Sequence, residues 1–226
     1  MVIVAHPDDA EFTVAGSVAR WVAEGHDVIY VICTDGSRGS NNPQMSPEQM
    51  ALVRQQEQRE AARILGLKDV VFLGYADGTL QATLELRRDI TREIRRYKPD
   101  LVVCGDPRVR IYNSTYLNHP DHRAAADAAL DAVFPSAETR FVFPELLDEG
   151  LEPHKVKEVY LSGTLEPDTW IDITDFIDQK IAALKAHKSQ VGEGAWVEEM
   201  IRGWNSATAQ GHGMAYAEAF KRIELE

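Results

Sequence analysis

Two short motifs in this chain gather side chains that bind metals and carry protons. Both begin His-Pro-Asp, and together they supply these groups: His6, Asp8, Asp9, His119, Asp121 and His122. Two imidazoles and one carboxylate, with other positions left to water, are typical of a catalytic zinc site, whereas a structural zinc needs four protein ligands and usually cysteine. The same set fits ferrous iron held by two histidines and a carboxylate. The plainer alternative is a group of helix caps and surface histidines.

A catalytic metal would leave two of these groups free for proton transfer. Bound zinc makes water more acidic and polarises a carbonyl, and hydrolysis also needs a base for the water and an acid for the leaving group. Adjacent Asp8 and Asp9 cannot share one environment, so one can bind metal while the other takes a proton. The leftover aspartate and histidine are the complement that amide hydrolysis requires.

Each motif lies where a predicted strand passes into a predicted helix. The apolar run Val2–Ala5 precedes the first motif, and a helical pattern from Phe12 to Gly25 follows it. The second motif follows the run Leu101–Cys104 and a long polar segment, 105–118, and Pro120 opens the next helix. In open α/β sheets, ligands bind in the crevice at the carboxyl ends of the strands. We therefore expect the two motifs to meet there.

Continuous apolar runs alternate with amphipathic helical patterns along the chain, as at 28–33, 70–73 and 101–104. Such runs are typical of strands buried on both faces. The pattern predicts an α/β fold, a Rossmann-like three-layer sandwich with a mostly parallel sheet, in a single domain over residues 1–226. The later part of the chain predicts strands at 140–143, 158–161, 170–174 and 220–223, a helix at 175–187, and a mobile aromatic-bearing loop at 192–213.

A well-marked helix is expected after Ser46, with a capping box to Gln49 and a stop at Gly66. Arg54 and Glu57 fall in the middle of its inward face, where charged groups are costly unless they are paired or line a polar cavity. One hypothesis is a buried structural ion pair. The other is that Arg54 reaches into the site and Glu57 holds it.

Several other segments have both a structural and a functional interpretation. The Gly-rich segment 34–43 is either a flexible connection or a wall of the site, and Asp77 before Gly78 either forms a turn or lines the pocket. For Asp172 and His187 we favour surface charge and a histidine at a helix C-terminus over site roles.

Composition excludes some classes of partner. The chain has 226 residues and a formal net charge of −12 at pH 7, without a basic patch, so nucleic acid is not an expected partner. No apolar run approaches the ~20 residues of a membrane span, and no signal peptide is recognisable, so no membrane partner is expected. Cys33 and Cys104 each end an apolar run without a C-x-x-C spacing. We interpret them as buried thiols, which favours a reducing, cytoplasmic location.

The motifs also carry a resemblance that extends along nearly the whole chain. It rests on AHPDD at 5–9, R-x-x-E at 54–57, A-x-x-L-G at 62–66, KPDLVV at 98–103, NHPDHR at 118–123, DITDFIDQKIAALKAHKSQV at 172–191 and YAEAF at 216–220. In these segments the chain resembles the PIG-L/LmbE-like N-acetylglucosaminyl deacetylase family. The resemblance implies a Rossmann-like fold and a zinc hydrolase that removes acetyl from an N-acetylglucosamine unit.

The resemblance also implies roles for individual residues. The zinc ligands, with ferrous iron as the alternative metal, would be His6, Asp9 and His122. Asp8 would be the general base, His119 would stabilise the oxyanion or protonate the amine, and Asp121 would orient His119. Contacts to the substrate would come from Arg54, with Asp77 and Tyr116 as candidate pocket residues.

The chain departs from the family pattern in places. Many members have glutamate directly after the aspartate pair, whereas Ala10 precedes Glu11 here, so Glu11 has no assigned role. The C-terminal region resembles the subgroup that includes diacetylchitobiose deacetylases, which indicates a chito-oligosaccharide or a similar small glycoside. Thiol-linked glucosamine conjugates are another option, and a phosphatidylinositol-linked sugar would need a membrane-facing surface. Relatives of this kind self-associate, so a homo-oligomer is implied.

Two other functions compete with the deacetylase hypothesis. A non-catalytic sugar- or nucleotide-binding α/β module has no need of Asp8 and His119 together. An iron oxygenase would need a co-substrate site, and such enzymes usually have other folds.

Overall fold

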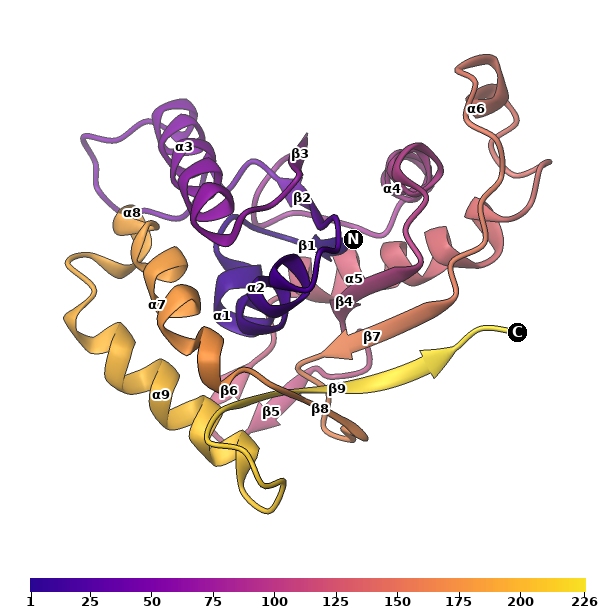
Figure 1. Cartoon of the computed structure of the whole chain (residues 1–226). Coiled ribbons are helices and arrows are strands. Elements are labelled where there is room, and N and C mark those ends of the chain that lie inside the picture. The colour runs from indigo at the N-terminus through magenta and orange to yellow at the C-terminus, as the bar shows by residue number, and fades with distance from the viewer.

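A seven-stranded sheet forms the centre of the protein in a computed structural model that describes residues 1–226 (Figure 1). Its strand order is β3-β2-β1-β4-β7-β9-β8. Only β9 runs against the others. The strands are β1 Val2–Val4, β2 Ile29–Thr34, β3 Asp69–Tyr75, β4 Leu101–Gly105, β7 Glu158–Ser162, β8 Thr169–Asp172 and β9 Ala217–Glu224. The predicted mostly parallel sheet is confirmed.

Helices cover both faces of this sheet (Figure 1). Ile3 of β1 packs with α4 (Leu84–Tyr97) and α5 (Pro120–Asp131) on one face, whereas Val2 packs with α2 (Ala15–Ala23), α3 (Pro47–Leu65) and α7 (Ile177–Lys185) on the other. Successive strand residues point to opposite faces. Because helices cover both faces, β2 is buried along its whole length. The predicted three-layer architecture is confirmed.

Shorter elements complete the fold. They are α1 Asp9–Thr13, β5 Ile111–Asn113, β6 Tyr116–Leu117, the π-helical stretch η1 Ala132–Ala137, α6 Glu145–Asp148, the 3-10 turn η2 Thr174–Phe176, α8 Lys188–Val191 and α9 Ala195–Ala209. Strands β5 and β6 form a separate antiparallel hairpin within the long polar segment before the second motif. Both cysteines are free and buried, as predicted. No helix combines the length and the apolar character that crossing a bilayer would require.

The termini of α3 agree with the sequence signals. The Ser46 hydroxyl accepts a hydrogen bond from the Gln49 amide, and the Gln49 side chain accepts one from the Ser46 amide. Gly66 follows with φ 77°, a conformation that glycine adopts without strain. The capping box and the glycine stop are both confirmed.

Two predictions for the later part of the chain are wrong. Residues 140–143 form turns before α6 rather than a strand. Segment 192–213 is mostly the helix α9, whose Val197 and Ile201 are fully buried against α7. Exposed tryptophans and five glycines concealed the helical period there, and tertiary packing of the apolar face stabilises the helix.

A buried ion pair joins the last strand to the helices beside the first motif. Lys180 of α7 lies 2.5 Å from Glu218 of β9, and both side chains are at most 2% exposed. The Glu218 carboxylate also accepts hydrogen bonds from the amides of Gly16 and Ser17 at 3.0 and 2.7 Å. These amides have no acceptor within their own helix. Glu218 therefore fixes the start of α2 to the sheet.

Candidate active site

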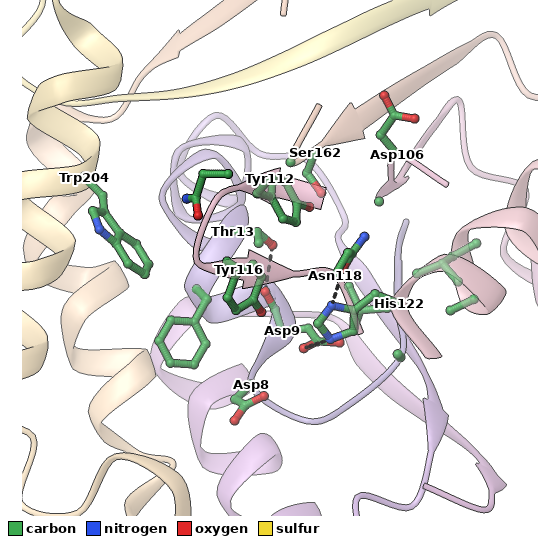
Figure 2. Close-up of a pocket in the computed structure, with 18 residues that line it drawn as sticks. Asp8, Asp9, Thr13, Asp106, Tyr112, Tyr116, Asn118, His122, Ser162 and Trp204 are labelled. Carbon is green, nitrogen blue, oxygen red and sulfur yellow. Dashed lines mark hydrogen bonds and ion pairs between the residues drawn. The ribbon is translucent and has the colours of Figure 1, made fainter. Parts of the chain in front are cut away.

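His6, Asp9 and His122 come together in space, although His122 lies 113 positions after Asp9 and 116 positions after His6 in the sequence. His6 follows β1, Asp9 opens α1, and His122 lies in the first turn of α5. Asp9 Oδ1 is 3.0 Å from His122 Nε2, and Asp9 Oδ2 is 3.4 Å from His6 Nδ1. Figure 2 shows the Asp9 carboxylate beside the His122 ring. The parallel order β1-β4 carries both motifs to one edge of the sheet.

The other ring nitrogens of these two histidines face oxygen atoms of the protein. His6 Nε2 is 3.1 Å from Asp77 Oδ1 and 3.3 Å from Asp121 Oδ2. His122 Nδ1 is 3.1 Å from the amide oxygen of Asn118. A histidine that ligates a metal nearly always donates its second N–H to such an oxygen. His6 Nδ1, His122 Nε2 and the Asp9 carboxylate are left facing one another, and this donor set fits a metal ion.

The electrostatics around His6 favour positive charge. Burial alone would lower the pKa of His6, but the carboxylates of Asp9, Asp121 and Asp77 raise it to about 12. Burial would likewise raise the pKa of Asp9, yet His122 and His6 hold it well below its usual range. A cation at this place would be attracted by the three carboxylates of Asp9, Asp77 and Asp121. The surrounding charges and the donor atoms therefore both favour a metal cation at this place.

The third histidine, His119, lies beside the other two but is held differently. Its ring centroid is 4.8 Å from that of His6 and 5.3 Å from that of His122. His119 Nδ1 accepts a hydrogen bond from the Asp121 backbone amide at 3.1 Å. Burial and nearby His6 lower the pKa of His119. Because Nδ1 accepts, the proton of the neutral ring lies on Nε2, which can donate a hydrogen bond.

Asp121 has different partners from those that the resemblance implied. Its carboxylate accepts hydrogen bonds from the amides of Gly78 and Leu80, at 2.7 and 3.2 Å, and also contacts His6. Its nearest approach to the His119 ring is 3.9 Å. Asp121 orients His119 through its backbone amide, whereas its side chain holds His6.

Asp8 is buried and lies next to Asp9 with a left-handed backbone, φ 93°, which is rare for a residue with a side chain. Its carboxylate is 3.3 Å from Arg54 Nη2. Burial raises the pKa of Asp8 to about 7, against the opposing effect of Arg54. The conformation turns Asp8 away from the Asp9 carboxylate and gives the two neighbours separate environments.

A chain of buried polar contacts holds the Asp8 backbone. The Asp8 amide donates to Gln58 Oε1 at 3.0 Å, and Gln58 Nε2 donates to Glu11 Oε1 at 2.9 Å. The other Glu11 oxygen is 3.3 Å from His187 Nε2. Gln58, Glu11 and His187 are all fully buried. His187 follows the C-terminus of α7, as expected, but it is buried against Glu11 rather than exposed, and Glu11 gains a structural role.

The hypothesis that Glu57 holds Arg54 is wrong. Glu57 accepts hydrogen bonds from the Ser189 amide and hydroxyl, at 2.7 and 2.6 Å. Arg54 instead donates to the carbonyl oxygens of Pro7 and Gly36, and pairs with Asp8. The inward stripe of α3 runs through Arg54 and Gln58, four residues apart, and this period was the signal that the sequence offered.

The candidate substrate contacts lie in two different places. Arg54 and Asp77 are 4% and 5% exposed, sit behind Asp8 and His6, and do not line the large cavity. Asp77 both forms the predicted turn and accepts a hydrogen bond from the Arg38 amide. Tyr116, by contrast, is half exposed and lines the cavity. Asp172 lies at the surface, where it accepts hydrogen bonds from Thr174.

A cavity of about 750 Å³ opens beside Asp8, Asp9 and His122 (Figure 2). Its walls come from the ends of β1, β4 and β7, from the hairpin β5–β6, and from α1 and α9. Its size lies within the range of about 300–1,000 Å³ that is usual for small-molecule sites. The candidate metal ligands therefore border a space that can admit a substrate.

Comparison with known proteins shows which family the sequence matches. Residues 1–133 match the family model "PIG-L: GlcNAc-PI de-N-acetylase". The chain is similar to a diacetylchitobiose deacetylase of Thermococcus kodakarensis, with 34% identity over 84% of this chain and 69% of that protein. It is also similar to a probable N-acetyl-alpha-D-glucosaminyl L-malate deacetylase 2 of Bacillus anthracis, with 28% identity over 84% of this chain and 80% of that one.

A solved structure extends the likeness to the C-terminal part. It is the N,N′-diacetylchitobiose deacetylase from Pyrococcus horikoshii, which matches with a TM-score of 0.89 and 32% identity. The match covers 97% of this chain and 81% of that one. The fold, the motifs and these matches define a deacetylase-type α/β protein. The chain belongs to the PIG-L family, and the resemblance seen in the sequence is confirmed.

Proposed function

We propose that this protein is a zinc-dependent hydrolase that removes the N-acetyl group from a small glycoside or conjugate containing N-acetylglucosamine. The observation that carries the proposal is the Asp9 carboxylate, which lies 3.0 Å from His122 and 3.4 Å from His6 with Asp8 beside it. The relatives are deacetylases of acetylated amino sugars, which supports the same reaction here.

We assign the metal to His6, Asp9 and His122. Zinc, or ferrous iron as the alternative, would supply a Lewis acid there that polarises the acetyl carbonyl and makes water more acidic. The contacts of His6 with Asp77 and Asp121, and of His122 with Asn118, support this assignment because they fix both rings and their tautomers.

Asp8 is the proposed general base. A base works best when its pKa lies near the working pH, and burial raises the pKa of Asp8 to about 7. Arg54 and Gln58 hold its side chain and its backbone in place. Asp8 would take the proton of the attacking water.

His119 is the proposed acid. Its Nδ1 accepts a hydrogen bond from the Asp121 amide, so the neutral ring can donate a hydrogen bond from Nε2 to the acetyl oxygen. In its protonated form the ring can give a proton to the leaving amine and become neutral. Arg54 and Asp77, first expected to touch substrate, would act from behind by holding Asp8 and His6. Tyr116 remains a proposed substrate contact. Cytoplasmic location, self-association and a single domain stay predictions.

The test combines metal content with acetate release. Purified protein, loaded with Zn²⁺ or Fe²⁺, is assayed by elemental analysis and by acetate release from N-acetylglucosamine and its glycosides. We expect near one metal per chain, largely lost in His122→Ala, and acetate release that follows the metal. Metal retained fully by a folded His122→Ala would contradict the ligand assignment. Sugar binding without acetate release from any compound would favour the non-catalytic module.

A further inference from the structure

The far wall of the cavity is aromatic. Trp204 of α9 and Tyr116 of β6 line it together with Phe12 and Tyr112, and the two tyrosine rings lie 5.6 Å apart at a tilt of 44°. Figure 2 shows Trp204 across the cavity from His122. Trp204 is 57% exposed and Tyr116 52% exposed. Large aromatic faces left uncovered inside a cavity are typical of a surface that packs against a ligand.

The cavity lining carries acidic groups but no lysine or arginine. Besides His122, its charged groups are Asp8, Asp9 and Asp106. The nearby cation, Arg108, is 60% exposed and already paired with Asp106 at 2.8 Å. Beyond the metal site, which would itself hold a cation, the lining therefore offers an anionic ligand no cationic side chain to pair with.

A donor for a hydroxyl group is also available in the lining. The amide oxygen of Asn113 accepts hydrogen bonds from the Thr115 amide and hydroxyl, at 2.8 and 2.7 Å. This fixes the Asn113 side chain and leaves its NH₂ group free to donate. Asn113 lines the cavity on the same hairpin as Tyr116.

We propose that the cavity is a subsite for the part of the substrate beyond the acetylated sugar, and that it takes a neutral ring with one apolar face, as a second sugar has. Trp204 and Tyr116 stack on that face, and Asn113 donates to a rim hydroxyl. Conjugates with an anionic second part, such as a malate or a phosphate, find no cationic side chain in this subsite and bind less well than a neutral sugar. This specificity inference rests on the proposed deacetylase function.

The experiment compares three probes on the metal-loaded enzyme: N-acetylglucosamine, N,N′-diacetylchitobiose and N-acetylglucosaminyl malate. We expect the neutral disaccharide to have the highest kcat/KM and the malate conjugate the lowest. In Trp204→Ala, the ratio of kcat/KM for disaccharide to monosaccharide should fall roughly 3- to 10-fold, mainly through KM. Trp204→Phe should keep most of the ratio.

The matched control is Trp196→Ala. Trp196 lies on the same helix and is 50% exposed, but it does not line the cavity. An unchanged ratio in Trp204→Ala, an equal fall in Trp196→Ala, or a preference for the malate conjugate would overturn the inference.

Failure of the proposed function would look different. If no probe releases acetate, the deacetylase proposal fails, and calorimetric binding of the intact disaccharide to Asp8→Asn still tests the subsite. Binding that weakens in Asp8→Asn/Trp204→Ala, relative to Asp8→Asn/Trp196→Ala, would support the subsite without catalysis. Equal binding, or none, would overturn it.

Discussion

The two strand-to-helix crossings differ in how firmly the rest of the protein holds them. At the first, the side chains of His6 and Asp8 are 9% and 12% exposed, and contacts reach them from α3, α5 and the turn after β3. At the second, the side chains of His119 and His122 are 41% and 31% exposed. His119 is held mainly by one backbone amide.

The difference separates two tasks. The buried crossing fixes the charge and direction of Asp8 and His6, because buried groups with complete hydrogen bonds have one arrangement. Both crossings border the cavity, and the more exposed second one leaves His119 and His122 freer to meet a substrate. Substitutions behind the first crossing should therefore impair chemistry without touching substrate. Four variants compare the base itself, a support of the second crossing, a support of the first crossing and a position that supports neither.

The largest effect is expected for Asp8→Asn. The amide cannot take a proton from water, so kcat should fall by about 10²–10⁴, while bound metal, measured by elemental analysis, stays unchanged. Near-normal acetate release from this variant would remove Asp8 from the role of base.

Asn118→Ala should come second. It removes the oxygen that faces His122 Nδ1 at 3.1 Å, and loss of such support typically weakens metal binding by about 10- to 100-fold. Competition with a chromogenic chelator measures this. Asn118→Asp keeps an acceptor for His122 and should bind metal far more tightly than the alanine variant. Equal affinities for the two variants would show that the Asn118 contact is incidental.

Gln58→Leu should have a smaller effect on rate and a clear effect on stability. It leaves the Asp8 amide and the Glu11 carboxylate without their buried partner, which costs about 1–3 kcal/mol of unfolding free energy. We expect kcat to fall roughly tenfold with little change in KM, because Asp8 loses the contact that holds its backbone. A tenfold fall corresponds to about 1.4 kcal/mol of activation free energy. The control is Gln56→Leu, an exposed position on the same helix. Urea unfolding and steady-state kinetics report the two effects, and an unchanged kcat would show that Asp8 does not depend on this chain.

The smallest effect is expected for Glu57→Gln. Its carboxylate meets Ser189 rather than Arg54, so activity should stay within about twofold and unfolding free energy within about 0.5 kcal/mol. A loss as large as that of Gln58→Leu would revive the hypothesis that Glu57 holds Arg54.

The sequence predicted the sheet and the meeting of the two motifs because both depend on local patterns. Buried strands show as continuous apolar runs, and His6 and His122 follow strands that lie side by side. The supports were harder to predict. Gln58 and His187 act through contacts between distant segments, whose partners the residues around them do not name. Asn118, by contrast, lies only four residues before its partner His122. Gln58 and Asn118 each had a signal, a spacing of four from buried Arg54 and from His122 respectively.

The same limit explains the missed helix α9. Its apolar face is narrow, with Val197 and Ile201 buried and Trp196 and Trp204 exposed. The helix is stabilised by α7, which the sequence of α9 does not reveal. Trp204 thus looked like part of a loop, although its place on a packed helix is what fixes it over the cavity.

The position of β9 inside the sheet also has a consequence during synthesis. Strand β8 pairs only with β9, and β9 covers the edge of β7. Residues 217–224 leave the ribosome after every other strand, so β1 to β4 and β7 can pair while β8 still has no neighbour. Until then the edge of β7 has unpaired backbone groups, and an open edge is a template for pairing with another chain. The nascent protein therefore has an open edge at β7 in addition to the one at β3, and completing β9 covers the edge of β7.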